Sequence, residues 1–132
     1  MDNSVNKLPA RESMTVEFKS DRSGFPDDDL VGALICLANT KGGELWLGVE
    51  DDGMPSGLHT SHNDLFGLSD LIASKTTPPL SVTVTLQIFS GIEVARIVVP
   101  KSNSLIATVD GVCLRRRLKH DGTPECITVD NE

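Results

Sequence analysis

The chain has 132 residues, enough for one domain that buries roughly two-thirds of the surface of its unfolded chain. Hydrophobic residues make up 39% of it, and no apolar run approaches the length of about 18 residues that a membrane-spanning helix needs. The formal net charge of −7 argues against indiscriminate binding to a polyanion, although four of the twelve Lys and Arg residues lie within residues 115–119.

The first residues carry no targeting signal and predict little structure. Residues 1–13 are typical of an exposed tail, and the alternating residues 15–18 predict a short strand. Residues 1–7 lack the positively charged and then apolar pattern of a secretory signal peptide. We therefore expect a cytoplasmic location by default.

A helix with clear ends follows. The run Asp27-Asp28-Asp29 favours a helix N-terminus, because carboxylates there accept free N–H groups and meet the positive end of the helix dipole. Apolar residues recur at helical spacing over residues 30–38, and Gly42-Gly43 ends the helix. This periodicity predicts that Leu34 is buried.

The middle of the chain predicts a buried strand and a second helix. Residues 44–49 are mostly apolar on both faces, as in a central strand, which predicts Trp46 in the core. Residues 51–57 are dense in turn-forming residues, and residues 63–74 have the apolar spacing of a helix.

The second half is rich in strands. Residues 81–88 alternate strictly and Ser90-Gly91 predicts a hairpin turn into residues 92–99. Residues 108–116 predict two short strands around Asp110-Gly111. The order of elements predicts an α+β domain, with a mixed β-sheet and two main helices packed on one of its faces.

The cysteines and histidines do not form a recognisable metal-binding pattern. Cys36, Cys113 and Cys126 are an odd number at distant spacings without a CxxC pair, so we expect all three to be reduced, with neither a zinc site nor a disulfide. His120 lies far from His59 and His62, which we expect in a loop and at a helix start.

Several short motifs, in order and spacing together, carry a family resemblance: Glu12-Ser13, Glu17-Phe18-Lys19, Ala38-Asn39-Thr40, Gly42-Gly43, Leu47-Gly48-Val49 with Asp51-Asp52-Gly53, Ile97 to Ser102 and Val112 to Arg116. Over roughly residues 10–125 the chain resembles the AlbA-2 domain of the Schlafen family. In bacteria such domains resemble the N-terminal part of larger regulators, formerly described as divergent AAA domains. The resemblance implies an AlbA-2-like fold and a role in binding nucleic acid.

In some animal relatives the resemblance also implies a metal-dependent endoribonuclease that uses two glutamates and an aspartate. Carried over by position, these catalytic and metal-binding acids fall on Glu12, Glu17 and Asp51. Carboxylates are the ligands that Mg²⁺ or Mn²⁺ would need to polarise a phosphate and activate water. Alternatively, Glu17 pairs with Lys19 on a strand face and Asp51 belongs to a simple turn. No cofactor is expected unless the nuclease hypothesis holds, in which case it is Mg²⁺ or Mn²⁺.

A nucleotide-binding loop is not supported by the glycines. Gly43 and Gly48 have the spacing of the phosphate-binding loop GxxxxGK[ST], but Val49-Glu50 follows in place of the lysine and the hydroxyl residue. Acidic residues at this position would repel a phosphate. We expect no ATP binding.

The predicted nucleic-acid-binding residues are basic side chains: Lys19, Arg115, Arg116, Arg117 and Lys119. Arginine forks suit phosphate groups, so a row of them positions a nucleic-acid backbone without reading its sequence. Alternation along a strand would turn some of these arginines inward, where they would pair with acids such as Glu44 or Glu93. As an alternative, arginines on an edge strand discourage strand addition.

Our first hypothesis is a DNA- or RNA-binding regulatory domain at residues 14–126 of a larger protein, with residues 127–132 a tail where the fragment ends. One alternative is the divalent-metal endoribonuclease. Another is an interaction or dimerisation module that uses strands 81–99. We expect nucleic acid as the partner and no association with a membrane. The sequence leaves open whether the chain forms a homodimer.

Overall fold

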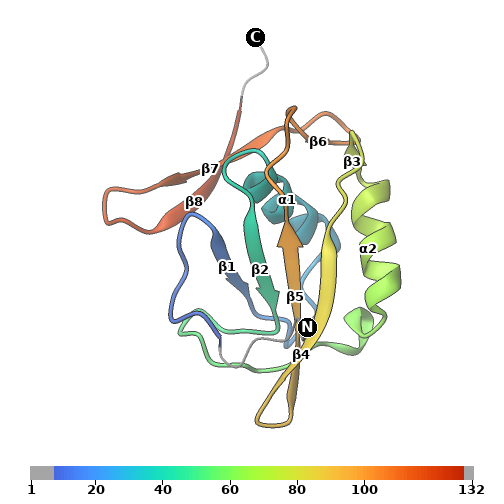
Figure 1. Ribbon diagram of the computed structural model, residues 1–132, viewed down its shortest axis with the longest axis vertical. Helices are drawn as coiled ribbons and strands as arrows, with labels where there is room; N and C mark the ends of the chain where they lie inside the picture. Colours follow the sequence, from blue (N-terminus) through green and yellow to red (C-terminus); the bar gives the residue numbers. More distant parts are fainter. Residues whose placement is uncertain (1–7, 130–132) are drawn as a thin grey trace, which may run out of the picture.

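The computed structural model describes residues 8–129 and confirms the predicted α+β class (Figure 1). Its main sheet has the strand order β1-β2-β5-β4, in which β1 and β2 are parallel and the other pairs are antiparallel. The sheet is therefore mixed, as predicted. Its strands are β1 (Val16–Lys19), β2 (Gly43–Leu47), β4 (Thr83–Phe89) and β5 (Ile92–Val99).

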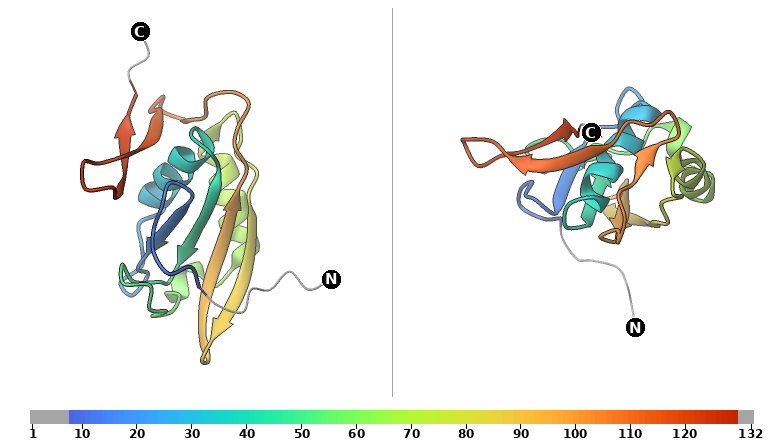
Figure 2. Two further views of the ribbon diagram at one scale, coloured as in Figure 1. Left: turned by 60° about the vertical axis from the view of Figure 1, so that its left-hand side comes forward. Right: turned by 90° about the horizontal axis from the view of Figure 1, so that it is seen from above.

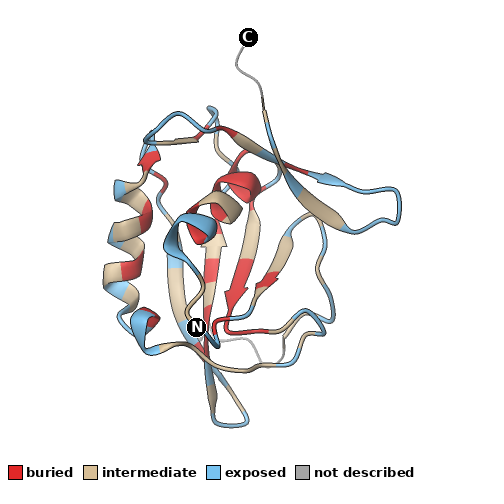
Figure 3. Cartoon of the chain, turned by 180° about the vertical axis from the view of Figure 1, so that it is seen from behind, coloured by how far each residue is buried: buried red, intermediate tan, exposed pale blue. Residues whose placement is uncertain are grey.

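Two helices, α1 (Asp27–Ala38) and α2 (Leu65–Ser74), pack on the same face of this sheet (Figures 1 and 3). Asp27, Asp28 and Asp29 lie in the first turn of α1, as predicted. The apolar face of α1, including the fully buried Leu34, packs with α2 and the sheet in the larger core cluster. A short 3₁₀ turn, η1 (Thr60–His62), precedes α2.

The turn between α1 and β2 needs its glycines. Gly42 has a φ of 71° and its N–H donates to the carbonyl of Leu37, which ends the helix. At Gly43 (φ 146°) an added Cβ would lie 2.2 Å from the carbonyl oxygen of Thr15. A side chain there would push β2 away from the chain that leads into β1.

The opposite face of the sheet carries a second, smaller core. Trp46 is buried there, as predicted, together with Phe18, and the guanidinium of Arg96 lies 5.8 Å from the Trp46 ring centroid. Leu8 also packs against this core, and Ser13 bridges to Val16. Residues 8–13 thus lie against the domain in part, with Ala10, Arg11 and Ser13 exposed, while residues 1–7 lie outside the described part.

The C-terminal part differs most from the prediction. Asp110-Gly111 does make a turn, across which Ala107 forms an antiparallel bridge with Cys113, and β6 (Ala107–Thr108) also pairs with β3 (Thr76–Thr77). The longer hairpin consists of β7 (Leu114–Leu118) and β8 (Pro124–Thr128), joined around Asp121-Gly122, and it projects from the body of the domain (Figure 2). Because β8 extends to Thr128, regular structure continues past residue 126.

A disulfide joins Cys36 of α1 to Cys126 of β8, with a Cα–Cα separation of 5.9 Å. The expectation of three reduced cysteines is therefore wrong for this pair, and Cys113 is a buried free thiol. The physical reason is that the β7–β8 hairpin lies beside α1, which brings together residues 90 positions apart. No helix within residues 8–129 is long and apolar enough to span a membrane.

Candidate functional site

Two of the three predicted acids lie together at the edge of the sheet. The Glu12 carboxylate accepts a hydrogen bond from the Phe18 N–H at 3.1 Å and shares another with Glu17. Burial raises the pKa of Glu12 to about 7, and the hydrogen bond and negative charge of Glu17 add to this effect. The two carboxyl groups thus hold one proton between them up to near-neutral pH.

Arg116 completes this cluster from strand β7. Its guanidinium pairs with the Glu17 carboxylate and donates to the carbonyls of Ser13, at 2.6 Å, and Val16, at 2.9 Å. Burial opposes ionisation of Glu17, but its hydrogen bonds with Glu12 and Arg116 lower its pKa below the usual value. Arg116 is buried, so its side chain faces the domain and not a phosphate.

This geometry agrees with the inward pairing expected for some of the arginines. The partner of Arg116 is Glu17, whereas Glu44 pairs with Arg96 at 2.7 Å. Lys19 also contacts Glu17, at 3.6 Å, as the strand-face alternative predicted.

The third predicted acid is not part of this cluster. Asp51 is exposed in the turn after β2 and, within residues 8–129, shares no hydrogen bond or ion pair with Glu12 or Glu17. No group of three or more His, Cys, Asp or Glu residues in the described part is arranged to hold a metal ion. Since Arg116 already supplies the positive charge beside Glu17, the residues as arranged do not fit a divalent cation. The catalytic roles stay a prediction.

The remaining predicted basic residues lie on the β7–β8 hairpin and on strand β1. Arg115, Arg117 and Lys119 are exposed on the β7–β8 hairpin, and Arg117 lies 3.4 Å from Glu125 on the paired strand. Because side chains alternate along a strand, Arg115 and Arg117 occupy the face of β7 opposite the buried Arg116. Lys19 lies on β1, with its ammonium group 5.6 Å from the centroid of the Phe25 ring.

A buried histidine between two carboxylates forms a second polar cluster. His62 Nδ1 lies 2.9 Å from Asp21, and its Nε2 lies 2.8 Å from Asp27 at the start of α1. Asp21 is fully buried and also accepts the backbone N–H groups of Phe25 and His59. Burial opposes the charged imidazolium, but hydrogen bonds and charges of Asp27 and Asp21 raise the pKa of His62.

A family profile described as Schlafen, AlbA_2 matches residues 12–123, most of the chain. The chain belongs to this family. Two solved structures from bacteria share the fold of this AlbA_2 domain, and the comparison with curated proteins gave no match.

The DIP2311 protein from Corynebacterium diphtheriae is 24% identical, with a TM-score of 0.71 over 89% of this chain. The N-terminal domain of a RecG-related protein from Nitrosomonas europaea is also 24% identical, with a TM-score of 0.60 over 74% of this chain and 72% of that domain. This AlbA_2 domain spans only a quarter of the DIP2311 chain. At these identities the likeness establishes the fold alone.

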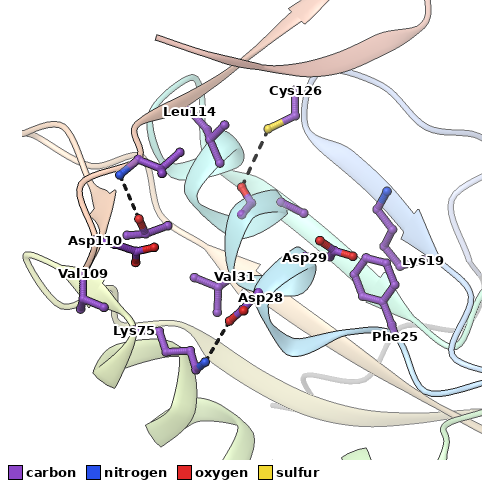
Figure 4. Close-up of a pocket in the computed structure, with 14 residues that line it drawn as sticks. Lys19, Phe25, Asp28, Asp29, Val31, Lys75, Val109, Asp110, Leu114 and Cys126 are labelled. Carbon is purple, nitrogen blue, oxygen red and sulfur yellow. Dashed lines mark hydrogen bonds and ion pairs between the residues drawn. The ribbon is translucent and has the colours of Figure 1, made fainter. Parts of the chain in front are cut away.

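The AlbA_2 domain also has a groove of about 500 Å³ that the sequence did not reveal (Figure 4). It lies along the exposed side of α1, with Val109 on one side and Leu114 and Cys126 above it, and Lys75 pairs with Asp28 at its rim at 2.9 Å. Its walls come from segments far apart in the sequence, so no local sequence pattern predicts the groove. The same holds for the His62 cluster, where Asp21 and His62 are separated by 41 positions.

Proposed function

We propose that this AlbA_2 domain binds DNA or RNA through the outer face of its β7–β8 hairpin, as one domain of a longer, cytoplasmic regulatory protein. The observation that carries the proposal is the exposure of Arg115, Arg117 and Lys119 on a hairpin that projects from the body (Figure 2). Family membership supports it, and the name of the RecG-related protein refers to a DNA helicase.

The chemistry of the hairpin favours contact with phosphates over reading of bases. Arginine donates two parallel hydrogen bonds to a phosphate, and two arginines on one strand face lie two residues apart. The aromatic residues that single-strand binding proteins stack on bases are scarce, since the chain has no Tyr and its one Trp is buried. We therefore expect weak binding that depends little on sequence and falls as salt rises.

The test is fluorescence anisotropy with short labelled DNA and RNA at low salt. The Arg115→Ala/Arg117→Ala/Lys119→Ala variant should bind both more weakly than the wild type. A matched variant, Arg11→Ala/Lys41→Ala/Lys101→Ala, removes the same number of positive charges from exposed positions elsewhere and should keep most of the affinity. Equal losses in the two variants would contradict a site on the hairpin.

A second candidate function is the metal-dependent endoribonuclease, which the contact between Glu12 and Glu17 favours. Its difficulty is the arrangement described above, in which no group of three acids within residues 8–129 is arranged to hold a metal ion and Arg116 pairs with Glu17. Incubation of labelled RNA with the purified chain and Mn²⁺ tests it. Cleavage that disappears in Glu12→Gln and Asp51→Asn variants would support the nuclease, and intact RNA would leave nucleic-acid binding as the function.

A third candidate, the interaction or dimerisation module, concerns strand β4. This strand ends the main sheet among the described strands, has no charged residue, and carries Leu86 and Ile88 with 43% and 60% of their surfaces exposed. Uncharged edge strands are open to pairing with another chain. Sedimentation velocity over a range of concentrations tests this candidate, because Leu86→Lys should abolish any association through β4.

A further inference from the structure

We propose that Cys36 and Cys126 are a redox-sensitive pair whose disulfide holds strand β8, and with it the basic hairpin, against helix α1. Their Cα–Cα separation of 5.9 Å lies inside the usual disulfide range of about 4.4–6.8 Å, so the bond closes without movement of the backbone. The two sulfurs differ in access: Cys36 is fully buried within α1, while Cys126 is exposed on β8.

The two strands of the hairpin are attached to the domain in different ways. Strand β7 has several polar contacts with the body: the Arg116 guanidinium with Glu17, the Arg116 N–H with Thr40 Oγ1 at 2.9 Å, and the Leu114 carbonyl with the Asn39 side chain at 2.9 Å. These contacts do not depend on the redox state, so β7 stays in place when the disulfide opens.

Strand β8 has far fewer contacts of this kind. Within the described residues, the polar and covalent contacts that β8 makes beyond β7 all involve Cys126: the disulfide to Cys36, and the approach of its sulfur to the carbonyl oxygen of Gly32 at 3.9 Å (Figure 4). The Cys126 thiol of the reduced chain would donate weakly to that carbonyl. Loss of the disulfide would therefore loosen β8 more than β7.

The chemistry needs a partner disulfide, such as oxidised glutathione. The Cys126 thiolate attacks one sulfur of that molecule, which forms a mixed disulfide and releases one small thiolate. The Cys36 thiolate then attacks the Cys126 sulfur, closes the protein disulfide and releases the second small thiolate. Two electrons pass from the cysteines to the small disulfide, and the two protons lost by the cysteine thiols end on the released thiolates. Excess small thiol reverses both steps.

This pairing would adjust binding at the hairpin, a consequence that rests on the proposed function. Arg117 pairs in register with Glu125, the neighbour of Cys126, so the position of β8 influences the outer face of the hairpin. A hairpin already fixed by the disulfide loses less conformational entropy when it binds. The oxidised chain should therefore bind nucleic acid more tightly than the reduced chain.

The pair itself is tested on the full chain, equilibrated in mixtures of oxidised and reduced glutathione. After denaturation in alkylating reagent, the oxidised chain should be modified at Cys113 only, and the reduced chain at all three cysteines. Amide hydrogen exchange in β8 should be about ten-fold faster after reduction, with β7 little changed. A Cys126→Ser variant should show no redox response, and Cys113→Ala should respond like the wild type. Complete alkylation of Cys36 and Cys126 under oxidising conditions would overturn the proposal. The same rate of amide hydrogen exchange in β8 in the oxidised and reduced chains would also overturn it.

Anisotropy separates this proposal from the proposed function. We expect the oxidised chain to bind short DNA or RNA about three- to ten-fold more tightly than the reduced chain, with no such difference in Cys126→Ser. A redox effect on β8 exchange without binding in either state would support the cysteine pair and contradict the function. Binding of nucleic acid by a chain whose cysteines and β8 amide exchange show no redox response would support the proposed function and contradict the cysteine pair.

Discussion

The guanidinium of Arg116 donates to Glu17 and to two main-chain carbonyls around β1, while Arg115 and Arg117 lie exposed on the other face of β7. Strand alternation was enough to predict that neighbouring arginines would differ in this way. The partner was not predictable, because Glu17 and Arg116 are 99 positions apart. The contact between Glu12 and Glu17 was easier to predict, because the two residues are close in sequence. The position of Asp51 was not predictable in this way, because it depends on the loop after β2.

Replacement of Arg116 by Ala should lower the free energy of unfolding by about 3–5 kcal/mol, because it removes the buried cation of the largely buried Glu17 carboxylate and leaves only Lys19, at 3.6 Å, beside it. Chemical denaturation of the variant and the wild type measures this difference. Arg115→Ala, at an exposed position on the same strand, should change stability by no more than about 0.5 kcal/mol. A similarly small loss for Arg116→Ala would contradict the ion pair.

His62 should make stability depend on pH. Its pKa in the folded chain is raised above the ordinary value of 6.5, because Asp27 and Asp21 favour the imidazolium. The resulting stabilisation is fully present below the pKa of the unfolded chain and is lost as pH rises through the folded pKa. The stability advantage of the wild type over His62→Gln, measured by denaturant unfolding, should therefore shrink as pH rises above the ordinary histidine pKa of about 6.5. His120→Gln, on the exposed hairpin, serves as the control; a constant difference for His62→Gln would contradict the charged pair.

At the scale of elements, the helix α1 and the strand β2 were predictable because their signals are local: an acidic first turn, apolar spacing and a glycine turn. The β7–β8 hairpin was missed because Asp110-Gly111 and Asp121-Gly122 offer the same turn dipeptide, and local sequence does not say which one joins the longer strands. The Cys36–Cys126 disulfide follows from the packing of that hairpin on α1, so it was hidden as well.

Truncation of Leu34 to Ala tests the packing of α1. Leu34 is fully buried in the larger core cluster, so the change should cost about 2–5 kcal/mol if the site does not collapse. Urea denaturation gives the value, and Ala33, half-buried beside it, provides a control as Ala33→Ser. A loss well under 1 kcal/mol for Leu34→Ala would show that the helix does not pack on the sheet in this register.

Opening of the disulfide tests how α1 and β8 are joined. Cross-linking residues 90 positions apart restricts the unfolded chain, so reduction should lower the free energy of unfolding by about 2–4 kcal/mol. Denaturation with and without a reducing agent measures the loss. The Cys126→Ser variant should already have the lower stability and should not respond to the reducing agent.

At the scale of the whole molecule, the net charge of −7 and the basic hairpin act in opposite directions on a nucleic acid. The acidic remainder repels a polyanion, so productive contact is expected only where Arg115, Arg117 and Lys119 project from the body. The family and the α+β fold were predictable from ordered motifs spread over nearly the whole chain. Function is less determined, because this AlbA_2 domain corresponds to a quarter of the DIP2311 chain.

The most direct test of binding at the hairpin is the salt dependence of affinity for a short labelled duplex, measured by anisotropy. Each phosphate that a basic residue neutralises releases condensed counterions, so three contacts predict that the logarithm of the binding constant falls with the logarithm of salt concentration with a slope of about −2 to −3. The Arg115→Ala/Arg117→Ala/Lys119→Ala variant should lose most of that slope, and the Arg11→Ala/Lys41→Ala/Lys101→Ala variant should keep it. Equal slopes in the wild type and the hairpin variant would contradict binding at the hairpin.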